Sequence, residues 1–136
     1  EDESFALEIA KQIEEDNLTR RELDKGITKQ ALEMISSNDH WKNDKSTVVY
    51  DADWHKGVIG IVASRLIEKH YKPTIVFTKS GDIAAGSARS VSGFDLYNAL
   101  ESCSEHLIQF GGHKYAAGMT IEIDKIEAFR KKFNEV

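Results

Sequence analysis

The chain has 136 residues, 40% of them hydrophobic and 30% charged, which suits one globular domain with one hydrophobic core. No apolar run approaches the roughly 20 residues that a membrane-spanning helix needs, and the acidic first residues are unlike the start of a signal peptide. The single cysteine, Cys103, excludes an intramolecular disulfide and a thiolate zinc cluster. We therefore expect a cytoplasmic protein with no membrane partner.

The overall charge of −5 is distributed unevenly along the chain. Residues 1–44 hold 12 acidic and 6 basic side chains, a net charge of −6, whereas residues 45–136 hold 11 acidic and 12 basic, a net charge of +1. The second part is therefore not repelled by phosphates, but it has no basic patch. Binding of nucleic acid there would depend on a few well-placed groups.

The first part of the sequence predicts a long linker helix. Apolar residues recur at spacings of three to five between Phe5 and Ile35, and loop-like sequence follows up to Asp44. We divide the chain into an interdomain linker helix and loop over 1–44 and a domain over 45–136. Because there is no initiator Met and the helical pattern at the end has no cap after it, we expect the chain to be an excised fragment.

The second part alternates between strand and helix patterns. Strands are predicted over 47–50, 74–78, 83–89 and 117–123, and helices over 58–67, 94–107 and 126–133. The turn at 80–82 predicts a hairpin between the second and third strands. This order predicts an α/β fold, a mixed sheet of about four to five strands flanked by helices.

The strongest local signal is Gly111-Gly112-His113-Lys114. Two adjacent glycines let a loop take positive φ and bring its N–H groups close to an oxyanion, while His113 supplies an imidazole. Such a loop can hold a phosphate and donate hydrogen bonds to it. The open alternative is an ordinary Gly-Gly turn with a surface histidine.

A second candidate is the segment Gly86-Ser87-Ala88-Arg89-Ser90. Ser87 and Arg89 are two residues apart, so on a strand they project from the same face and present a hydroxyl beside a guanidinium. That pair suits a terminal phosphate. An edge strand whose arginine pairs with a surface carboxylate remains the alternative.

A third candidate lies where the first strand meets the 58–67 helix. Gly57 and Gly60 leave space for a ligand at the helix N-terminus, although they serve equally for tight helix packing. Asp51, Asp53 and His55 alternate and form a conceivable metal site, but such residues at a strand end more often serve turns and caps. We predict no metal ligand in this chain.

Three segments in order, 54–66, 86–96 and 110–118, together resemble the DHH-associated domain of bacterial RecJ-type exonucleases. The resemblance covers about residues 46–133. The Gly-Gly-His element is shared with the wider DHH phosphoesterase superfamily, which includes oligoribonucleases and cyclic-dinucleotide phosphodiesterases. The first two segments look more like RecJ than like those relatives.

This resemblance implies a parent protein that is a 5′-to-3′ exonuclease on single-stranded DNA. Its Mn²⁺ or Mg²⁺ would be held by a preceding DHH domain of the same polypeptide, the second expected partner besides DNA. This sequence contains no Asp-His-His, so we expect the fragment to be inactive alone.

The resemblance also implies roles for individual residues. Ser87 and Arg89 would hold the 5′-phosphate or a neighbouring one, Gly111 and Gly112 would let the backbone approach, and His113 is the catalytic candidate, reaching towards the scissile phosphate. Further candidates for contact with phosphate or nucleic acid are Ser90, His55 and Lys114.

Two other functions remain open at this stage. The domain could serve a small-nucleotide phosphodiesterase that hydrolyses oligoribonucleotides or cyclic dinucleotides. It could also be a non-catalytic interaction module whose glycines serve only packing.

Overall fold

The computed structural model describes residue 22, residues 25–36 and residues 45–135. The elements are β1 (Thr47–Tyr50), α3 (Ile59–Lys69), β2 (Thr74–Ser80), β3 (Ile83–Arg89), α4 (Leu96–Ser102), β4 (Gln109–Gly112), β5 (Ala116–Glu122) and α5 (Ile126–Glu135), with 3₁₀ turns at Ser104–His106 and Ile123–Lys125. Residues 25–36 are also helical, whereas most of the predicted linker helix lies outside the described residues.

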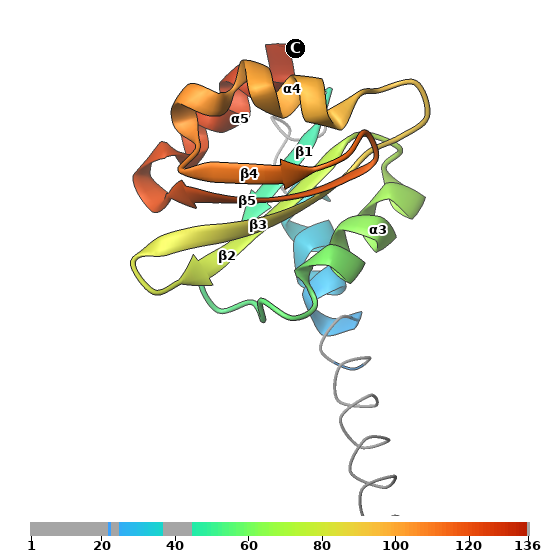
Figure 1. Ribbon diagram of the computed structural model, residues 1–136. Helices are drawn as coiled ribbons and strands as arrows, with labels where there is room; N and C mark the ends of the chain where they lie inside the picture. The colour runs from blue at the N-terminus through green and yellow to red at the C-terminus, as the bar shows by residue number, and fades with distance from the viewer. Residues whose placement is uncertain (1–21, 23–24, 37–44, 136) are drawn as a thin grey trace, which may run out of the picture.

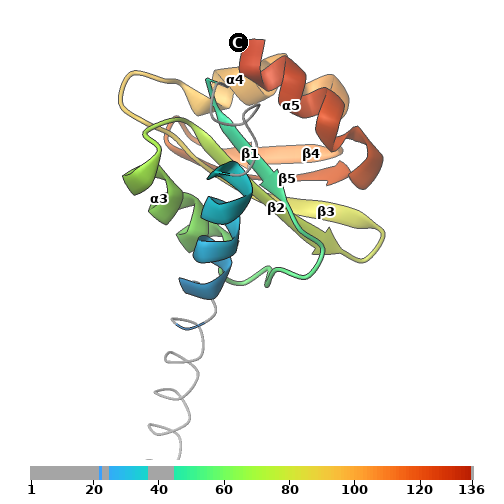
Figure 2. The same cartoon turned by 180° about the vertical axis from the view of Figure 1, so that it is seen from behind.

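The five strands form one mixed sheet in the order β1-β2-β3-β5-β4. The first pair, β1 and β2, is parallel, and every other pair is antiparallel. Helices α4 and α5 cover one face, while α3 and the helical residues 25–36 lie on the other (Figures 1 and 2). The predicted α/β fold with a mixed sheet flanked by helices is therefore confirmed.

Side-chain alternation along the strands divides the interior into two cores. Ile75 and Phe77 of β2 join α4 and α5 in one core, and the intervening Val76 joins α3 in the other. All three side chains have 0% of their surface exposed, and burying each contributes about 1.5–3 kcal/mol to folding. The sheet is thus held from both sides.

The helical residues 25–36 are part of the packed structure. Ile27, Ala31 and Ile35 are buried in the same core as Val49 and Trp54, and the Trp54 Nε1 donates a 3.0 Å hydrogen bond to Gln30 Oε1. The spacing of four residues between the three buried positions places them on one helix face. This segment therefore closes the face of the sheet beside α3.

Two elements differ from the sequence-based expectation. The predicted helix over 94–107 is α4 followed by a 3₁₀ turn, and it begins at the Asp95 cap, whose carboxylate accepts from the Asn98 N–H. Cys103 caps the end of α4 and is fully buried. Strand β4 was not predicted, because its Gly-Gly pair is typical of a turn.

Candidate functional site

Ser87 and Arg89 lie on the sheet face that α3 covers. Ala88 between them is buried in the opposite core, so alternation turns its two neighbours towards α3. A Cβ placed on Gly60 would be 2.8 Å from Arg89 Nη2 and 3.6 Å from Ser87 Oγ. The hydroxyl and the guanidinium therefore lie together over the first turn of α3, and Gly60 provides the space for them.

The Arg89 guanidinium is only partly engaged by the protein. Its Nη1 donates a 2.8 Å hydrogen bond to the Ala88 carbonyl oxygen. Within the described ranges it has no ion pair with a carboxylate, which was the alternative considered from the sequence. The remaining N–H donors can bind a planar oxyanion.

The Gly-Gly element is the end of a strand rather than a loop. Gly111 and Gly112 belong to β4 and pair with Gly118 and Ala117 of β5. Gly112 has a φ of +143°, and a Cβ on it would be 2.6 Å from the Ala117 Cα, so this glycine is required by the hairpin. The expected phosphate loop is therefore a β-hairpin whose tip begins at His113.

His113 occupies the tip of this hairpin with its ring orientation fixed. The Tyr115 N–H donates to His113 Nδ1 at 3.2 Å, and the His113 N–H donates to the Ala116 carbonyl oxygen at 2.9 Å. Because Nδ1 accepts a hydrogen bond, the neutral imidazole carries its proton on Nε2. The exposed side chain thus presents an N–H donor to solvent.

Backbone hydrogen bonds tie this hairpin tip to the end of β3. Arg89 pairs with Ala116, and the Ser90 N–H donates to the Tyr115 carbonyl oxygen at 3.0 Å. Two pairs further along, Ser87 pairs with Gly118. The strand that carries Ser87 and Arg89 therefore lies beside β5, and its end lies next to the turn that carries His113.

Two further candidates flank the tip in different ways. The Ser90 hydroxyl donates to the Phe94 carbonyl oxygen at 2.9 Å and lies 3.2 Å from that of Val91, so it holds the loop before α4. Lys114 is exposed, and its carbonyl oxygen accepts from the Leu96 N–H. Its ammonium group can therefore reach a ligand without disturbing the turn.

His55 shows the same local geometry as His113 but lies on another segment. The Gly57 N–H donates to His55 Nδ1 at 3.0 Å, and a Cβ on Gly57 would be 2.9 Å from the imidazole. Asp51 serves the preceding turn, with its carboxylate accepting from the Asp53 N–H at 2.8 Å. Among the described residues, the hydrogen bond of His55 is to its own segment and not to the Ser87 and Arg89 cluster.

A groove on the open half of the sheet contains residues that sequence reasoning missed. It has a volume of about 420 Å³, and its lining includes Lys56, Gln109, Gly111, Gly118 and Thr120. Helix α3 packs on β2 and β3, so the same face of β5 and β4 stays accessible. Side chains two residues apart in β4 and β5 share a face of the sheet, and this alternation could have pointed to the groove residues. It could be used only once residues 109–112 were recognised as a strand.

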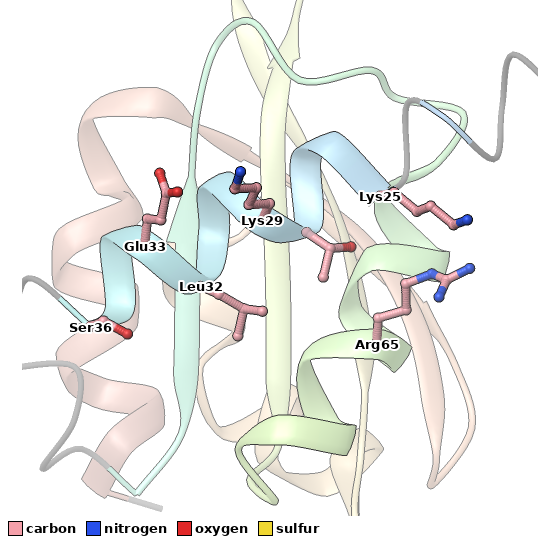
Figure 3. A pocket seen from close by; sticks show the side chains of 7 residues that line it. Lys25, Lys29, Leu32, Glu33, Ser36 and Arg65 are labelled. Atoms are coloured by element: carbon pink, nitrogen blue, oxygen red, sulfur yellow. The ribbon is translucent and has the colours of Figure 1, made fainter.

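Another groove lies between the helical residues 25–36 and α3 (Figure 3). Its volume is about 360 Å³, and Figure 3 shows Lys25, Lys29 and Leu32 on one side with Arg65 on the other. None of the predicted site residues lines it.

Charge and metal chemistry add two observations. Burial raises the pKa of the Cys103 thiol from 9.0 to about 11, against the opposing effect of Lys132, but this residue lies in the core on the sheet face opposite Ser87 and Arg89. In the part of the chain that the structure describes, no three His, Cys, Asp or Glu side chains gather as a metal site. No described helix is long and apolar enough to cross a membrane.

The geometry defines an α/β domain with a cluster of anion-compatible donors at the end of its central strand β3 and in the neighbouring β4–β5 turn. A family model described as the DHHA1 domain matches residues 43–136, which is more than half of the chain. The chain therefore belongs to the DHHA1 domain family.

The chain is similar to known proteins both in sequence and in structure. The chain is 38% identical over 138 residues to the single-stranded-DNA-specific exonuclease RecJ of Bacillus subtilis, covering 100% of this chain and 17% of the relative. The structure of RecJ with Mg²⁺ from Thermus thermophilus matches with a TM-score of 0.75 and 29% identity, covering 88% of this chain and 18% of that one. An exonuclease RecJ bound to manganese matches with a TM-score of 0.74 and 28% identity, over 88% of this chain and 29% of that one. The chain thus spans about a fifth of the length of the first two.

Proposed function

We propose that this domain binds phosphates of single-stranded DNA for a metal-dependent DHH catalytic domain of the same polypeptide, within a 5′-to-3′ exonuclease. The observation that carries the proposal is that Ser87 and Arg89 lie on β3, which pairs with β5, while His113 lies in the β4–β5 turn next to the end of β3. The Bacillus subtilis relative is named a single-stranded-DNA-specific exonuclease, which supports the same class of substrate.

Ser87 and Arg89 hold the 5′-phosphate or the one next to it. The free N–H groups of Arg89 form a fork that matches two oxygens of a phosphate, and the Ser87 hydroxyl donates to the same group. Because Arg89 is only partly exposed, water competes less for these bonds than at an open surface. A terminal phosphate, with more charge than a diester, gains most from such a site.

His113 acts at the hairpin tip on a second phosphate, the scissile one. Its Nε2–H donates to a phosphate oxygen, while Nδ1 accepts from the Tyr115 N–H. Because Gly111 and Gly112 have no side chains, that phosphate can approach the adjoining backbone closely. Ser90 and Lys114, which flank the hairpin tip, are further candidate contacts, and His55 on the separate segment before α3 is another.

The metal ions belong to the partner domain rather than to this chain. The described residues gather no metal site, so we derive no catalytic step through a metal here. Mn²⁺ or Mg²⁺ in the DHH domain would supply an activated water and offset charge on the phosphate. This chain alone is accordingly expected to bind DNA without cleaving it.

The direct test is to map the binding surface on the isotopically labelled chain by NMR. Titration with a 5′-phosphorylated single strand should shift amide signals at 87–90 and 111–115 and leave α4 and α5 unchanged. Shifts confined to the α4–α5 face would contradict the proposal. Turnover by the longer natural protein that is rapid on dinucleotides and absent on long strands would instead favour a small-nucleotide phosphodiesterase.

A further inference from the structure

The groove between the helical residues 25–36 and α3, called the interhelical groove below, is lined by none of the proposed phosphate contacts. Leu32 points into the space between the two helices, while Lys25 and Arg65 extend from the same end of the groove (Figure 3). The lining surface is mostly apolar, and the volume is about 360 Å³. The structure therefore leaves apolar surface accessible between two packed helices.

This apolar surface continues along both helices. On α3, Ile61 precedes Arg65 by four residues, so the two side chains lie on one side of that helix, and Ile61 is 46% exposed. On the other helix, Leu32 is only partly buried against the core beneath it. Apolar side chains that remain accessible between two helices are typical of a surface that a further helix covers.

The charges around the interhelical groove are mostly positive. Lys25, Lys29 and Arg65 contribute three cations, against the single carboxylate of Glu33. Lys25 and Lys29 are both exposed and lie four residues apart, where like charges on a helix repel each other. This concentration of positive charge contrasts with the net charge of −5 over the whole chain. An anionic partner would replace the repulsion with attraction.

The lining favours an acidic peptide over single-stranded DNA as that partner. Proteins commonly hold single strands with aromatic rings that stack on the bases, and no aromatic residue of the described chain lines this groove. An acidic amphipathic helix presents apolar side chains at spacings of three and four residues, with carboxylates beside them. That pattern is complementary to an apolar floor with lysines at its rim.

We propose that the interhelical groove docks an acidic amphipathic helix of a partner protein, which packs as a third helix beside residues 25–36 and α3. Its apolar side chains contact Leu32 and Ile61, and its carboxylates pair with Lys25 and Lys29. This interaction is independent of the proposed binding of DNA phosphates, because it uses a different set of residues.

The test titrates the isotopically labelled 136-residue chain with synthetic peptides of about 18 residues, which are long enough to form a helix. One set has leucines on one helix face and glutamates beside them. The second set has lysine in place of glutamate, and the third has the same leucines scattered around the helix. The acidic amphipathic peptides should shift amide signals over 25–36 and 61–69, whereas the other two sets should not. Added salt should weaken the binding.

Variants of the chain identify the groups that hold the peptide. The double variant Lys25→Glu, Lys29→Glu should weaken binding by about tenfold or more, and Leu32→Ala by about threefold to tenfold. The matched control is Lys131→Glu, which changes an exposed lysine of α5 on the other side of the sheet and should leave the dissociation constant unchanged (Figures 1 and 2). Because both groove lysines are exposed, the double variant should stay folded, which thermal melts followed by circular dichroism verify.

Three results would overturn the proposal. The first is an absence of shifts over 25–36 and 61–69 with every acidic amphipathic peptide, and the second is unchanged affinity in the double lysine variant. The third is a different occupant. A single-stranded oligonucleotide that shifts these signals would indicate nucleic acid, and the same shifts on concentrating the chain alone would indicate a second copy. None of these results bears on the 5′-phosphate preference assigned to Arg89, so the two proposals fail separately.

Discussion

The Arg89 guanidinium rests over Gly60, so closely that a Cβ on Gly60 would stand 2.8 Å from Nη2. Gly60 on α3 and Arg89 on β3 are 29 positions apart in the sequence. Their contact gives Gly60 a role in placing the arginine side chain. Alanine at this position is acceptable to a helix, and the far end of an arginine can move. We therefore expect an alanine at position 60 to affect phosphate binding by Arg89 rather than folding.

We predict that Gly60→Ala lowers the preference for 5′-phosphorylated over 5′-hydroxyl DNA by about tenfold, since the displaced guanidinium no longer meets the phosphate. The free energy of unfolding should change by no more than about 1 kcal/mol. Fluorescence anisotropy with both oligonucleotides and urea unfolding check the two statements. In an Arg89→Ala background, Gly60→Ala should have no further effect on the preference, and an additive loss would argue against this coupling.

The two nitrogens of His113 can be separated by substitution. Asparagine places its carbonyl oxygen near Nδ1 and keeps the acceptor for the Tyr115 N–H, whereas glutamine reaches the position of Nε2. Because the phosphate contact is assigned to Nε2, His113→Gln should retain more DNA affinity than His113→Asn, by roughly threefold to tenfold in the dissociation constant. The reverse order would show that the hairpin turn, rather than the donor, is what binding needs.

Gly86 and Gly111 form a matched pair for stability. Gly86→Ala would press a Cβ to 2.5 Å from the Phe77 ring and 3.0 Å from the Met119 sulfur, and we expect it to destabilise the fold by about 1–3 kcal/mol. Gly111→Ala meets open space and should change stability by about 0.5 kcal/mol or less. Chemical denaturation of the two variants measures both values, and equal stabilities would contradict the packing described for β3.

The buried Cys103 predicts a dependence on pH. Its folded pKa of about 11 exceeds the unfolded value of 9.0, so the folded state holds the thiol proton more tightly. This contribution to stability is fully present below pH 9 and is lost as the pH rises towards 11. Native protein should react slowly with a thiol reagent at pH 8 and quickly in denaturant. A Cys103→Ala variant, which lacks the titrating group, should show a smaller loss of stability over that pH range.

Binding should depend only moderately on salt. The domain has a net charge close to neutral over 45–136, and the proposal gives it two or three phosphate contacts. For single strands this corresponds to a slope of about −1.4 to −2.1 in a plot of log affinity against log salt concentration. A much steeper slope would indicate binding through a broad electrostatic surface and would contradict the two or three contacts proposed.

Strand β3 and its paired side chains were predictable because alternation in an extended segment fixes which side chains share a face. Strand β4 was not, because its Gly-Gly sequence has low strand propensity and is held by backbone pairing with β5. The role of Gly60 required knowledge of a tertiary neighbour, and so did the groove lined by Gln109 and Thr120. Local sequence thus indicated the candidate polar side chains. Their tertiary neighbours could be seen only in the packed sheet.

The most direct test of the central claim is the affinity of the chain for one single-stranded oligonucleotide with a 5′-phosphate or a 5′-hydroxyl end, for the wild type, Arg89→Ala and Arg89→Lys. The account predicts that the wild type prefers the phosphorylated end, that Arg89→Ala removes the preference, and that Arg89→Lys restores it only in part, because lysine lacks the bidentate fork. Equal affinity of the wild type for both ends, unchanged in Arg89→Ala, would contradict it.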